Sequence, residues 1–408
     1  MRLAVFQPSF AAVGGAELLA AMQAAYFQAQ GLDVKVVTFG FDAARWRERL
    51  AGLPVATVAK RHWSDPLVAW TRLAKLKRRA QRAARALQGC DVVLAYNYPC
   101  STMLAVADVV ARKVWQCNEP PKNLHMREAN PVLTAHVQST AGKGLEDVCG
   151  AFAQRLVAYD RSLARKAFLH ALRKFDIDRV SKLDEIYAIS AFSRDNVRRI
   201  YGRCRDEVIP PMVRFPDAVA PRAGLDRSGL KVLVHSRLEQ PKNIDTVLRG
   251  FAHFRKLACP QAQLHVVGQG SYRPRLESLA RELCPSDAIR FHGFLNDTDA
   301  RRVYAAADVM ALLPVDEPFG MVFPEAAAHG LLLVGPDHGG PLEILDAGRL
   351  GWVCNAFSPD ALGEVFARIW ALDDATVDRR RSAADQACRA RYAPDVVGRQ
   401  LLRVLSAR

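Results

Sequence analysis

Short apolar segments alternate with stretches of helical spacing along this chain of 408 residues. Strands that alternate with helices in this way form βαβ units, and such units build parallel sheets. Half of the residues are hydrophobic, so a large buried core is available. The sequence therefore predicts an α/β protein with parallel sheets. The expected strands are residues 3–6, 34–38, 92–95, 114–116, 185–189, 232–235, 264–267, 289–291, 309–313 and 331–334.

Adjacent prolines mark the expected boundary between two domains. Pro210 and Pro211 lie in the short segment 208–212, and consecutive prolines interrupt helix and sheet alike. We therefore expect one α/β domain over residues 1–209 and a second over residues 210–393.

Two regions differ from the alternating pattern. Residues 120–182 lack strand patterning, so we expect them to form a helical insert in the first domain. Residues 394–408 show helical apolar spacing and are expected to form a terminal helix.

Composition limits the cellular setting and the partners. No apolar run reaches the roughly 18–20 residues of a membrane-spanning helix, and the first residues are typical of a strand rather than a secretory signal. Nine cysteines without metal-type spacing fit a reducing compartment, so we expect a cytoplasmic protein. The net charge of +15 indicates an anionic partner, such as a phosphorylated ligand, nucleic acid or an acidic membrane surface.

Two glutamates surround a glycine after the apolar run 309–315. Glu317 would lie in the loop beyond a strand's carboxyl end, and Glu325 would lie inside a helix that opens near Gly320. Ligands of open α/β sheets bind at this end of the strands. Ionised carboxylates accept several hydrogen bonds, so the pair suits a hydroxyl-rich ligand.

Basic residues and glycines follow other expected strands. Arg237 and Lys242 come just after a strand, where a guanidinium and an ammonium group could neutralise a pyrophosphate or simply be solvated. Gly14 and Gly15 precede helical spacing, where the backbone could contact a phosphate or sugar or form a tight turn. The turn at Gly268 has the same two interpretations, a nucleotide contact or plain turn chemistry.

Taken in their order along the chain, these segments resemble the signatures of the retaining nucleotide-sugar glycosyltransferases of family 4. Residues 317–325 resemble the E-x7-E signature, 14–17 the G-G-x-E loop, and 338–343 the G-G-x-x-E loop. Residues 236–243 resemble G-R-L-x-x-x-K-N, with Ser236 where glycine is usual. The resemblance implies the GT-B fold, in which two Rossmann-like domains with parallel sheets face an interdomain cleft. It also implies that the terminal helix crosses back to the first domain.

The resemblance assigns a role to each charged residue of the second domain. It places Glu317 at the transferred sugar and Glu325 at the ribose hydroxyls. Arg237 and Lys242 would hold the donor diphosphate and stabilise its charge as the leaving group. The remaining donor contacts that it implies are Gly14, Gly15, Gly268, Gly293, Phe319, Gly320, Met321 and Val322.

The segment 114–122 resembles the family's H-x-P-P-R variant, with Asn118 at the histidine and Lys122 at the arginine. An amide cannot carry a proton as imidazole does, so Asn118 would hydrogen-bond the sugar or acceptor and would not act as a base. In the front-face mechanism associated with the family, the leaving phosphate oxygen takes the acceptor proton. Glu119 is a second candidate on the acceptor side, and loop capping is its alternative.

Basic residues also accumulate between positions 60 and 85. On a helix, Arg72, Lys75, Arg79 and Arg82 would form a stripe beside an apolar one. Such a helix suits an anionic membrane surface, which would place the protein at the inner face of the membrane. A core-packed helix with a solvated basic face is the alternative, and a phosphorylated soluble acceptor could also use this charge.

We therefore expect a retaining hexosyltransferase that uses GDP-mannose or a UDP-sugar. Its acceptor would be a glycan or a lipid-linked molecule in polysaccharide or glycolipid assembly. No cluster of acidic or histidine ligands is recognised in the matching regions, so we expect neither a metal nor another cofactor. The alternative is a non-catalytic sugar-nucleotide or polyanion-binding protein on the same scaffold. Nucleic acid is not an expected partner, because it would leave the paired glutamates unexplained.

Overall fold

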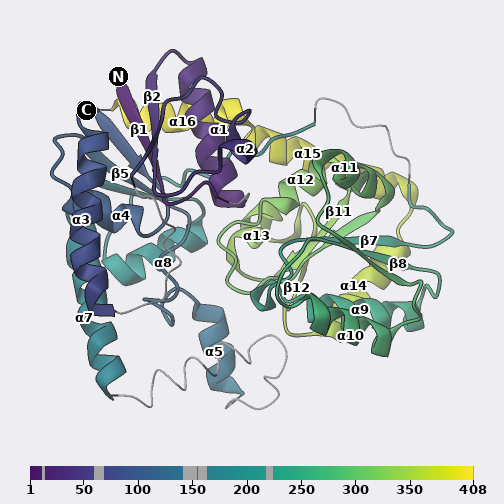
Figure 1. Ribbon diagram of the computed structural model, residues 1–408. Coiled ribbons are helices and arrows are strands. Elements are labelled where there is room, and N and C mark those ends of the chain that lie inside the picture. Colours follow the sequence, from purple (N-terminus) through teal and green to yellow (C-terminus); the bar gives the residue numbers. More distant parts are fainter. Residues whose placement is uncertain (12–13, 59–68, 141–153, 155–162, 217–223, 408) are drawn as a thin grey trace. The chain divides into compact units, whose positions relative to one another are not determined.

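The computed structural model describes residues 1–11, 14–58, 69–140, 154, 163–216 and 224–407. The chain divides into two compact units, which are described separately. The first unit comprises Met1–Ala129, Tyr159–Met212 and Pro394–Arg408, and the second comprises Asn130–Ala158 and Val213–Ala393. Each unit contains one sheet of six parallel strands with helices packed against it (Figure 1).

The first sheet has the strand order β3-β2-β1-β4-β5-β6, with every neighbouring pair parallel. This is the Rossmann order, in which the connection reverses direction between β1 and β4. The strands are β1 (Arg2–Gln7), β2 (Asp33–Thr38), β3 (Val55–Thr57), β4 (Val92–Ala95), β5 (Arg112–Cys117) and β6 (Glu185–Ala188).

The second sheet has the order β12-β11-β10-β7-β8-β9 and is also fully parallel. Counted from its own first strand, it repeats the Rossmann order, with the reversal between β7 and β10. Its strands are β7 (Lys231–His235), β8 (Gln263–Val267), β9 (Ile289–Gly293), β10 (Val309–Ala311), β11 (Leu332–Pro336) and β12 (Trp352–Cys354).

The predicted fold class is confirmed. All ten expected strands are present, and no strand end is shifted by more than two residues. The sequence analysis missed β3 and β12. Each has three residues, lies at an edge of its sheet and keeps two residues partly exposed. A short edge strand needs no continuous apolar run, so it leaves little pattern to detect.

Helices cover both faces of the sheets. The helices of the first unit are α1 (Gly15–Ala29), α2 (Ala43–Trp46), α3 (Ala69–Leu87), α4 (Cys100–Val106), α7 (Leu163–Val180), α8 (Ala191–Tyr201) and α16 (Pro394–Ser406). Those of the second unit are α5 (Pro131–Ser139), η1 (Gln240–Lys242), α9 (Ile244–Leu257), α10 (Arg273–Leu283), α11 (Asp297–Ala306), α12 (Val322–Ala328), α13 (Gly339–Ile344), η2 (Asp346–Gly348), α14 (Pro359–Trp370) and α15 (Asp374–Tyr392).

The expected insert at 120–182 contains α5 and α7, which belong to different units. Residues 141–153 and 155–162 of this region lie outside the described residues. The terminal helix α16 belongs to the first unit and packs against α1.

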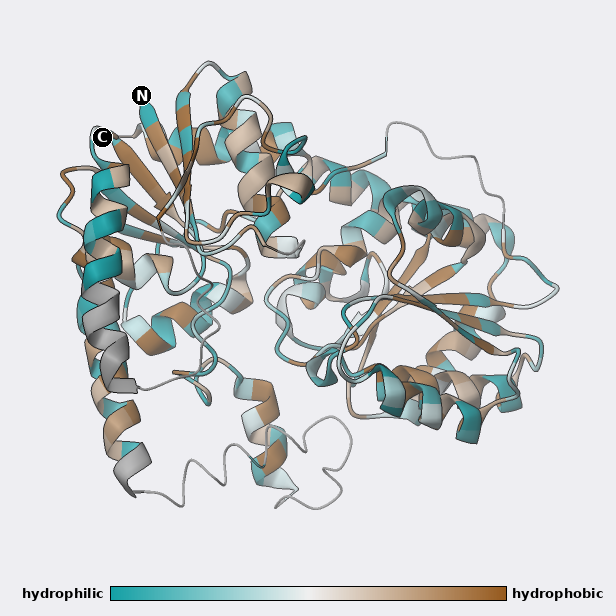
Figure 2. Ribbon diagram, viewed as in Figure 1, coloured by the Kyte–Doolittle hydropathy of each residue, from teal (hydrophilic) through white to brown (hydrophobic). Residues whose placement is uncertain are grey.

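The period of two along β1 explains how helices pack on both faces of the first sheet. Leu3 and Val5 point into one core cluster, which also contains Leu401 of α16. Ala4 and Phe6 point into the opposite cluster. The strands of both sheets are correspondingly hydrophobic along most of their length (Figure 2).

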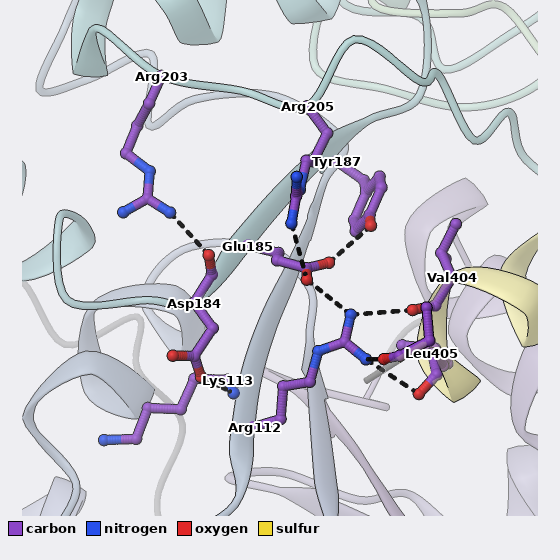
Figure 3. Close-up of polar contacts among 10 residues, drawn as sticks. Arg112, Lys113, Asp184, Glu185, Tyr187, Arg203, Arg205, Val404 and Leu405 are labelled. Atoms are coloured by element: carbon purple, nitrogen blue, oxygen red, sulfur yellow. Dashed lines mark hydrogen bonds and ion pairs between the residues drawn. The ribbon is translucent and has the colours of Figure 1, made fainter.

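A half-buried arginine binds the end of α16 to this sheet (Figure 3). Arg112 of β5 donates hydrogen bonds to the carbonyl oxygens of Val404 at 2.9 Å and Leu405 at 3.1 Å, and to Glu185 of β6 at 2.7 Å. A cation is favourable there because the last carbonyl groups of a helix carry partial negative charge.

Burial and the hydrogen bond to Glu185 raise the pKa of Tyr187 to about 12.

Candidate functional site

The candidate donor site lies in the second unit, in the loops that follow β7 and β10. These neighbouring strands border the point where the strand order reverses, and ligands of open α/β sheets bind beyond the carboxyl ends of such strands. Arg237 and Lys242 follow β7, whereas Glu317 follows β10. The sheet therefore brings together residues that are far apart in sequence.

An ion pair joins the two loops. Lys242 Nζ lies 2.5 Å from Glu317 Oε2, and both side chains are about one fifth exposed, at 20% and 19%. The neighbouring Asn243 fixes the end of η1, because its side chain donates to the carbonyl oxygens of Leu313 and Ala356 at 2.9 and 2.6 Å. The site thus presents a cation and a carboxylate from a rigid backbone at a partly open position.

Glycines of the loop after β11 hold the backbone of Glu317. Gly340 N donates to Glu317 O at 2.9 Å, and a Cβ at Gly340 would overlap the carbonyl oxygen of Pro318. Only glycine permits this approach, so the predicted G-G-x-x-E loop supports the E-x7-E loop directly.

The glycines near Arg237 also serve packing between loops. Gly268 has a φ of 129°, and a Cβ there would overlap the carbonyl oxygen of Ser236. Its N–H donates to the carbonyl oxygen of Gly293 at 2.8 Å. The close approach to Ser236 gives Gly268 a packing reason, the plainer of the two interpretations that the sequence allowed, and its contact with a nucleotide stays a prediction. The Arg237 side chain is exposed above them.

The second glutamate of the motif has an unusual environment. Burial, helped by the charge of Asp297, raises the pKa of Glu325 on α12 to about 7. The charge of Glu325 contributes in turn to the raised pKa of Tyr304, whose main cause is burial. The Tyr304 ring packs 4.9 Å from the His329 ring and its hydroxyl lies 2.8 Å from His235 Nδ1. The sequence analysis missed this row of rings, because its members come from three separate elements.

The intervening residues of the motif contribute through their backbone. Phe319 is buried, and its ring packs edge-on against Tyr392 of α15 at 5.2 Å. Gly320 turns the chain with a φ of 93°, and Met321 precedes the first residue of α12, Val322. The side chain of Phe319 is therefore part of the core, and a ligand could contact only its peptide groups.

The matching position of the first unit combines two glycines, two amides and the carboxylate of Glu17. Gly14 and Gly15 follow β1 and open α1, and Gly14 lies against Glu17. Asn97 follows β4, and Asn118 follows β5. Asn118 Nδ2 donates to Asn97 Oδ1 at 3.1 Å, and Asn118 is 8% exposed.

Two of the acceptor-side candidates pair with each other. Lys122 Nζ lies 2.9 Å from Glu119 Oε2, with exposed side-chain fractions of 31% and 44%. The same loop is anchored by His125, which is buried against Asp176 of α7 at 2.9 Å. The sequence analysis gave His125 no role, and only the fold reveals its partner 51 residues away.

The basic helix α3 is partly described. Its residues Ala80, Ala83 and Leu87 are buried in the core of the first unit, which favours the core-packed alternative for this part of the apolar stripe. Burial and the neighbouring charge of Arg82 lower the pKa of Arg79. The side chains of Arg72 and Lys75 lie outside the described residues.

The described residues contain neither a membrane-spanning helix nor a metal-type cluster of side chains. No helix there is long and apolar enough to cross a membrane. In the same part of the chain, no three side chains of His, Cys, Asp or Glu are grouped as a metal site requires.

Two family models match consecutive parts of the chain. The model described as Glycosyltransferase Family 4 matches residues 13–214, and the model described as Glycosyl transferases group 1 matches residues 220–387. Together they extend over both units.

Two curated relatives show moderate similarity. The glycogen synthase of Mycobacterium tuberculosis (strain ATCC 25618 / H37Rv) is 27% identical over 284 residues, which are 68% of this chain and 63% of the relative. The GDP-mannose-dependent alpha-(1-6)-phosphatidylinositol monomannoside mannosyltransferase of the same strain is 29% identical over 217 residues, 49% of this chain and 54% of that protein. The chain thus spans less than two thirds of the length of either relative.

Solved structures resemble the whole chain. Anabaena Alr3699/HepE in complex with UDP-glucose has a TM-score of 0.68 at 17% identity, with all of both chains covered. Sucrose-phosphate synthase from Thermosynechococcus elongatus has a TM-score of 0.71 at 18% identity, with 99% of this chain and 98% of that chain covered. At these identities the likeness concerns the fold.

Proposed function

Because this chain belongs to the family 4 glycosyltransferases of the GT-B fold, we propose that it transfers a hexosyl unit from a nucleotide-diphosphate sugar. The acceptor is a glycan or a lipid-linked molecule in polysaccharide or glycolipid assembly. Transfer retains the anomeric configuration and needs no metal ion. The observation that carries the proposal is the Lys242–Glu317 pair beyond β7 and β10, with Arg237 on the same side.

The charges of this site suit the two ends of the donor. Lys242 and Arg237 neutralise the diphosphate, since guanidinium and ammonium groups bind phosphate oxygens strongly. Glu317 accepts hydrogen bonds from hydroxyls of the transferred sugar, and Lys242 orients it. Glu325 accepts hydrogen bonds from the ribose, which favours its ionised form.

The reaction requires little proton chemistry from the protein. The bond between the anomeric carbon and the diphosphate oxygen breaks, and a bond to the acceptor oxygen forms on the same face. The acceptor proton passes to the departing phosphate oxygen, so the products are a glycoside and a nucleoside diphosphate. Arg237 and Lys242 stabilise the charge that develops on the leaving group. Asn118 hydrogen-bonds the sugar or acceptor, because an amide is no base.

We favour GDP-mannose or a UDP-sugar as the donor. One relative is by name a GDP-mannose-dependent mannosyltransferase, and one structural neighbour holds UDP-glucose. The basic face of α3 is the surface through which the first unit would bind an anionic membrane.

A thermal-shift screen tests the donor site. GDP, UDP, ADP and their sugar conjugates are added with and without EDTA, since a ligand that binds the native state raises the melting temperature. We expect one nucleotide series to stabilise the protein equally with EDTA, and Arg237→Ala to abolish the shift. Arg281→Ala is the matched control, because Arg281 is exposed in the last turn of α10, which connects β8 and β9 and lies outside the loops after β7 and β10.

Each other outcome of the screen has a definite meaning. A shift that EDTA abolishes would contradict metal independence. No shift with any nucleotide, or a shift unchanged in Arg237→Ala, would contradict the donor site. Once the donor is known, the anomeric proton coupling of the product in NMR spectra decides between retention and inversion. Donor binding without transfer to any acceptor would favour the non-catalytic alternative.

A further inference from the structure

Asp316 immediately precedes Glu317 and has three unusual properties. Its side chain is buried, with a relative exposure of 1%. Its φ is 52°, in the left-handed region that residues other than glycine seldom occupy. Its carboxylate faces the beginning of α5, a helix whose chain position lies between β5 and β6 of the other unit.

The Asp316 carboxylate caps α5. Oδ1 accepts from Val132 N at 3.1 Å, and Oδ2 accepts from Leu133 N at 2.9 Å. These N–H groups lie in the first turn, where a helix supplies no acceptor of its own. The residue at the N-cap position, Asn130, makes no side-chain capping hydrogen bond. A carboxylate 184 residues away in sequence therefore performs this function, favoured by the helix dipole.

A second contact holds α5 one turn further along. The His136 ring stacks on the Phe357 ring with centroids 3.7 Å apart and planes 5° from parallel. Phe357 lies in the loop after β12, which also supplies the Ala356 carbonyl oxygen that Asn243 binds. Helix α5 is thus attached to the same group of loops that forms the candidate donor site.

Three consecutive residues of the Glu317 loop have three different anchors. Val315 N donates to the carbonyl oxygen of Pro241 at 3.0 Å, and Glu317 O accepts from Gly340 at 2.9 Å. Between them, Asp316 is held by α5 in a conformation that carries a backbone cost. Release of Asp316 would let the backbone leave that conformation, and the direction of the Glu317 side chain would change with it.

We propose that Asp316 is a positioning residue that aims Glu317 at the transferred sugar by gripping the start of α5. The inference rests on the proposed function, in which Glu317 binds that sugar. The inference also gives α5 a role, because the helix follows the loop of Asn118, Glu119 and Lys122 in the chain. Within the segment 118–139, His125 pairs with Asp176 of the first unit, and the start of α5 binds Asp316 of the second unit.

The contact can be tested without any reaction. Hydrogen exchange of the full-length protein should show protected amides at Val132 and Leu133, although both lie in a first helical turn. In Asp316→Asn and Asp316→Gly we expect these amides to exchange roughly tenfold faster or more, because a charge-assisted acceptor is lost. The control is Asp346→Asn, because Asp346 also has a φ of 50° but pairs with the exposed Arg349. Unchanged protection in both Asp316 variants would overturn the capping role.

Binding of two ligands tests the effect on Glu317. The donor found by the screen and its nucleoside diphosphate are titrated against wild type and both variants. We expect affinity for the nucleotide sugar to fall roughly tenfold and affinity for the diphosphate to change less than about threefold. In Asp316→Gly the left-handed backbone conformation no longer has a cost, but the carboxylate is still missing. An equal loss of affinity for the nucleotide sugar in both variants therefore assigns the effect to the carboxylate.

The outcomes separate this inference from the proposed function. If wild type binds neither ligand, the proposed function fails. If wild type binds both and the variants bind both equally well, only the role of Asp316 is overturned. A parallel loss of both affinities would also overturn it, because general damage to the site does not discriminate between the ligands.

Discussion

The two units have the same strand order but different chemistry at the reversal point. Beyond β7 and β10 lie a guanidinium, an ammonium group and a carboxylate, two of them joined at 2.5 Å. Beyond β1, β4 and β5 lie two glycines, a pair of amides (Asn97 and Asn118) and an ion pair of opposite charges, Lys122–Glu119. The same topology therefore places a guanidinium and an ammonium group at one reversal point and an amide pair at the other, and the side chains, not the fold, determine what each can bind.

The difference agrees with a division of labour in sugar transfer. A diphosphate needs cations, and these lie in the second unit. An acceptor hydroxyl needs orientation and no charge, which an amide can supply. Predictions that remove or exchange these groups test whether the division is real.

The largest effect is expected for Lys242→Ala. The substitution removes one diphosphate contact and also leaves the Glu317 carboxylate without its 2.5 Å partner. We expect kcat/KM to fall roughly 100- to 1000-fold, because an electrostatic contact to the leaving group is lost. Steady-state kinetics measure the loss, with Lys256→Ala as control, since Lys256 is exposed in the last turn of α9. Comparable rates in both variants would remove Lys242 from the donor site.

A smaller loss is expected for Asn118→Ala in the amide pair of the first unit. It removes an orienting hydrogen bond but no charge, so turnover should fall roughly tenfold, while the dissociation constant of the donor nucleotide stays within about twofold. Asn123→Ala, an exposed position in the same loop, should leave both quantities unchanged. A large loss of nucleotide affinity in Asn118→Ala would contradict the division between the two units.

A membrane-binding assay tests whether the basic face of α3 in the first unit binds anionic lipid. Arg82 is exposed on α3, and a basic residue near an anionic bilayer contributes about 1 kcal/mol. Arg82→Ala should therefore weaken co-sedimentation with phosphatidylserine vesicles roughly fivefold. Vesicles of phosphatidylcholine alone and the Arg281→Ala variant are the controls. Equal sedimentation of wild type and Arg82→Ala would assign α3 to the core alone.

The smallest effect concerns Glu325 and pH. Its pKa is about 7 in the folded protein and near the ordinary 4.5 when unfolded, so its contribution to stability is present below pH 4.5 and is lost as pH rises through 7. Glu325→Gln should therefore melt roughly 1–3 °C above wild type at pH 8 and at the same temperature at pH 4.5. Differential scanning calorimetry at both values checks this. A melting difference that is the same at pH 4.5 and pH 8 would contradict the raised pKa.

Local patterns predicted most of the fold. Most of the ten predicted strands contain adjacent apolar residues, whereas β3 and β12 have three residues each and gain their pairing at sheet edges from neighbours. The proximity of Lys242 and Glu317 was also predictable, because their motifs follow neighbouring strand ends, and their role in donor binding stays a proposal. Helix α5 could be recognised as helical, but its place in the second unit depends on contacts with Asp316 and Phe357.

Other features depend on pairs that are distant in sequence. The burial of His125 against Asp176 and the ring row at Tyr304 arise only when separate helices pack. Gly268 was interpreted as a possible nucleotide contact or a plain turn, and the contacts that a Cβ at 268 or 340 would make with Ser236 and Pro318 show a packing reason that no single segment contains. Sequence patterns thus indicate burial and backbone conformation, whereas contacts between residues that are distant in sequence become known only from the structure.

The return of α16 to the first unit has a consequence for synthesis on the ribosome. Val397, Leu401, Val404 and Leu405 complete the core on one face of the first sheet, yet they are translated after the whole second unit. At about 5–20 residues per second, the roughly 180 residues in between take on the order of 10–40 s. During that time the α1 surface that α16 will cover is open to water. The first unit to emerge is therefore the last to be finished, and its nascent form is a substrate for chaperones that bind apolar surface.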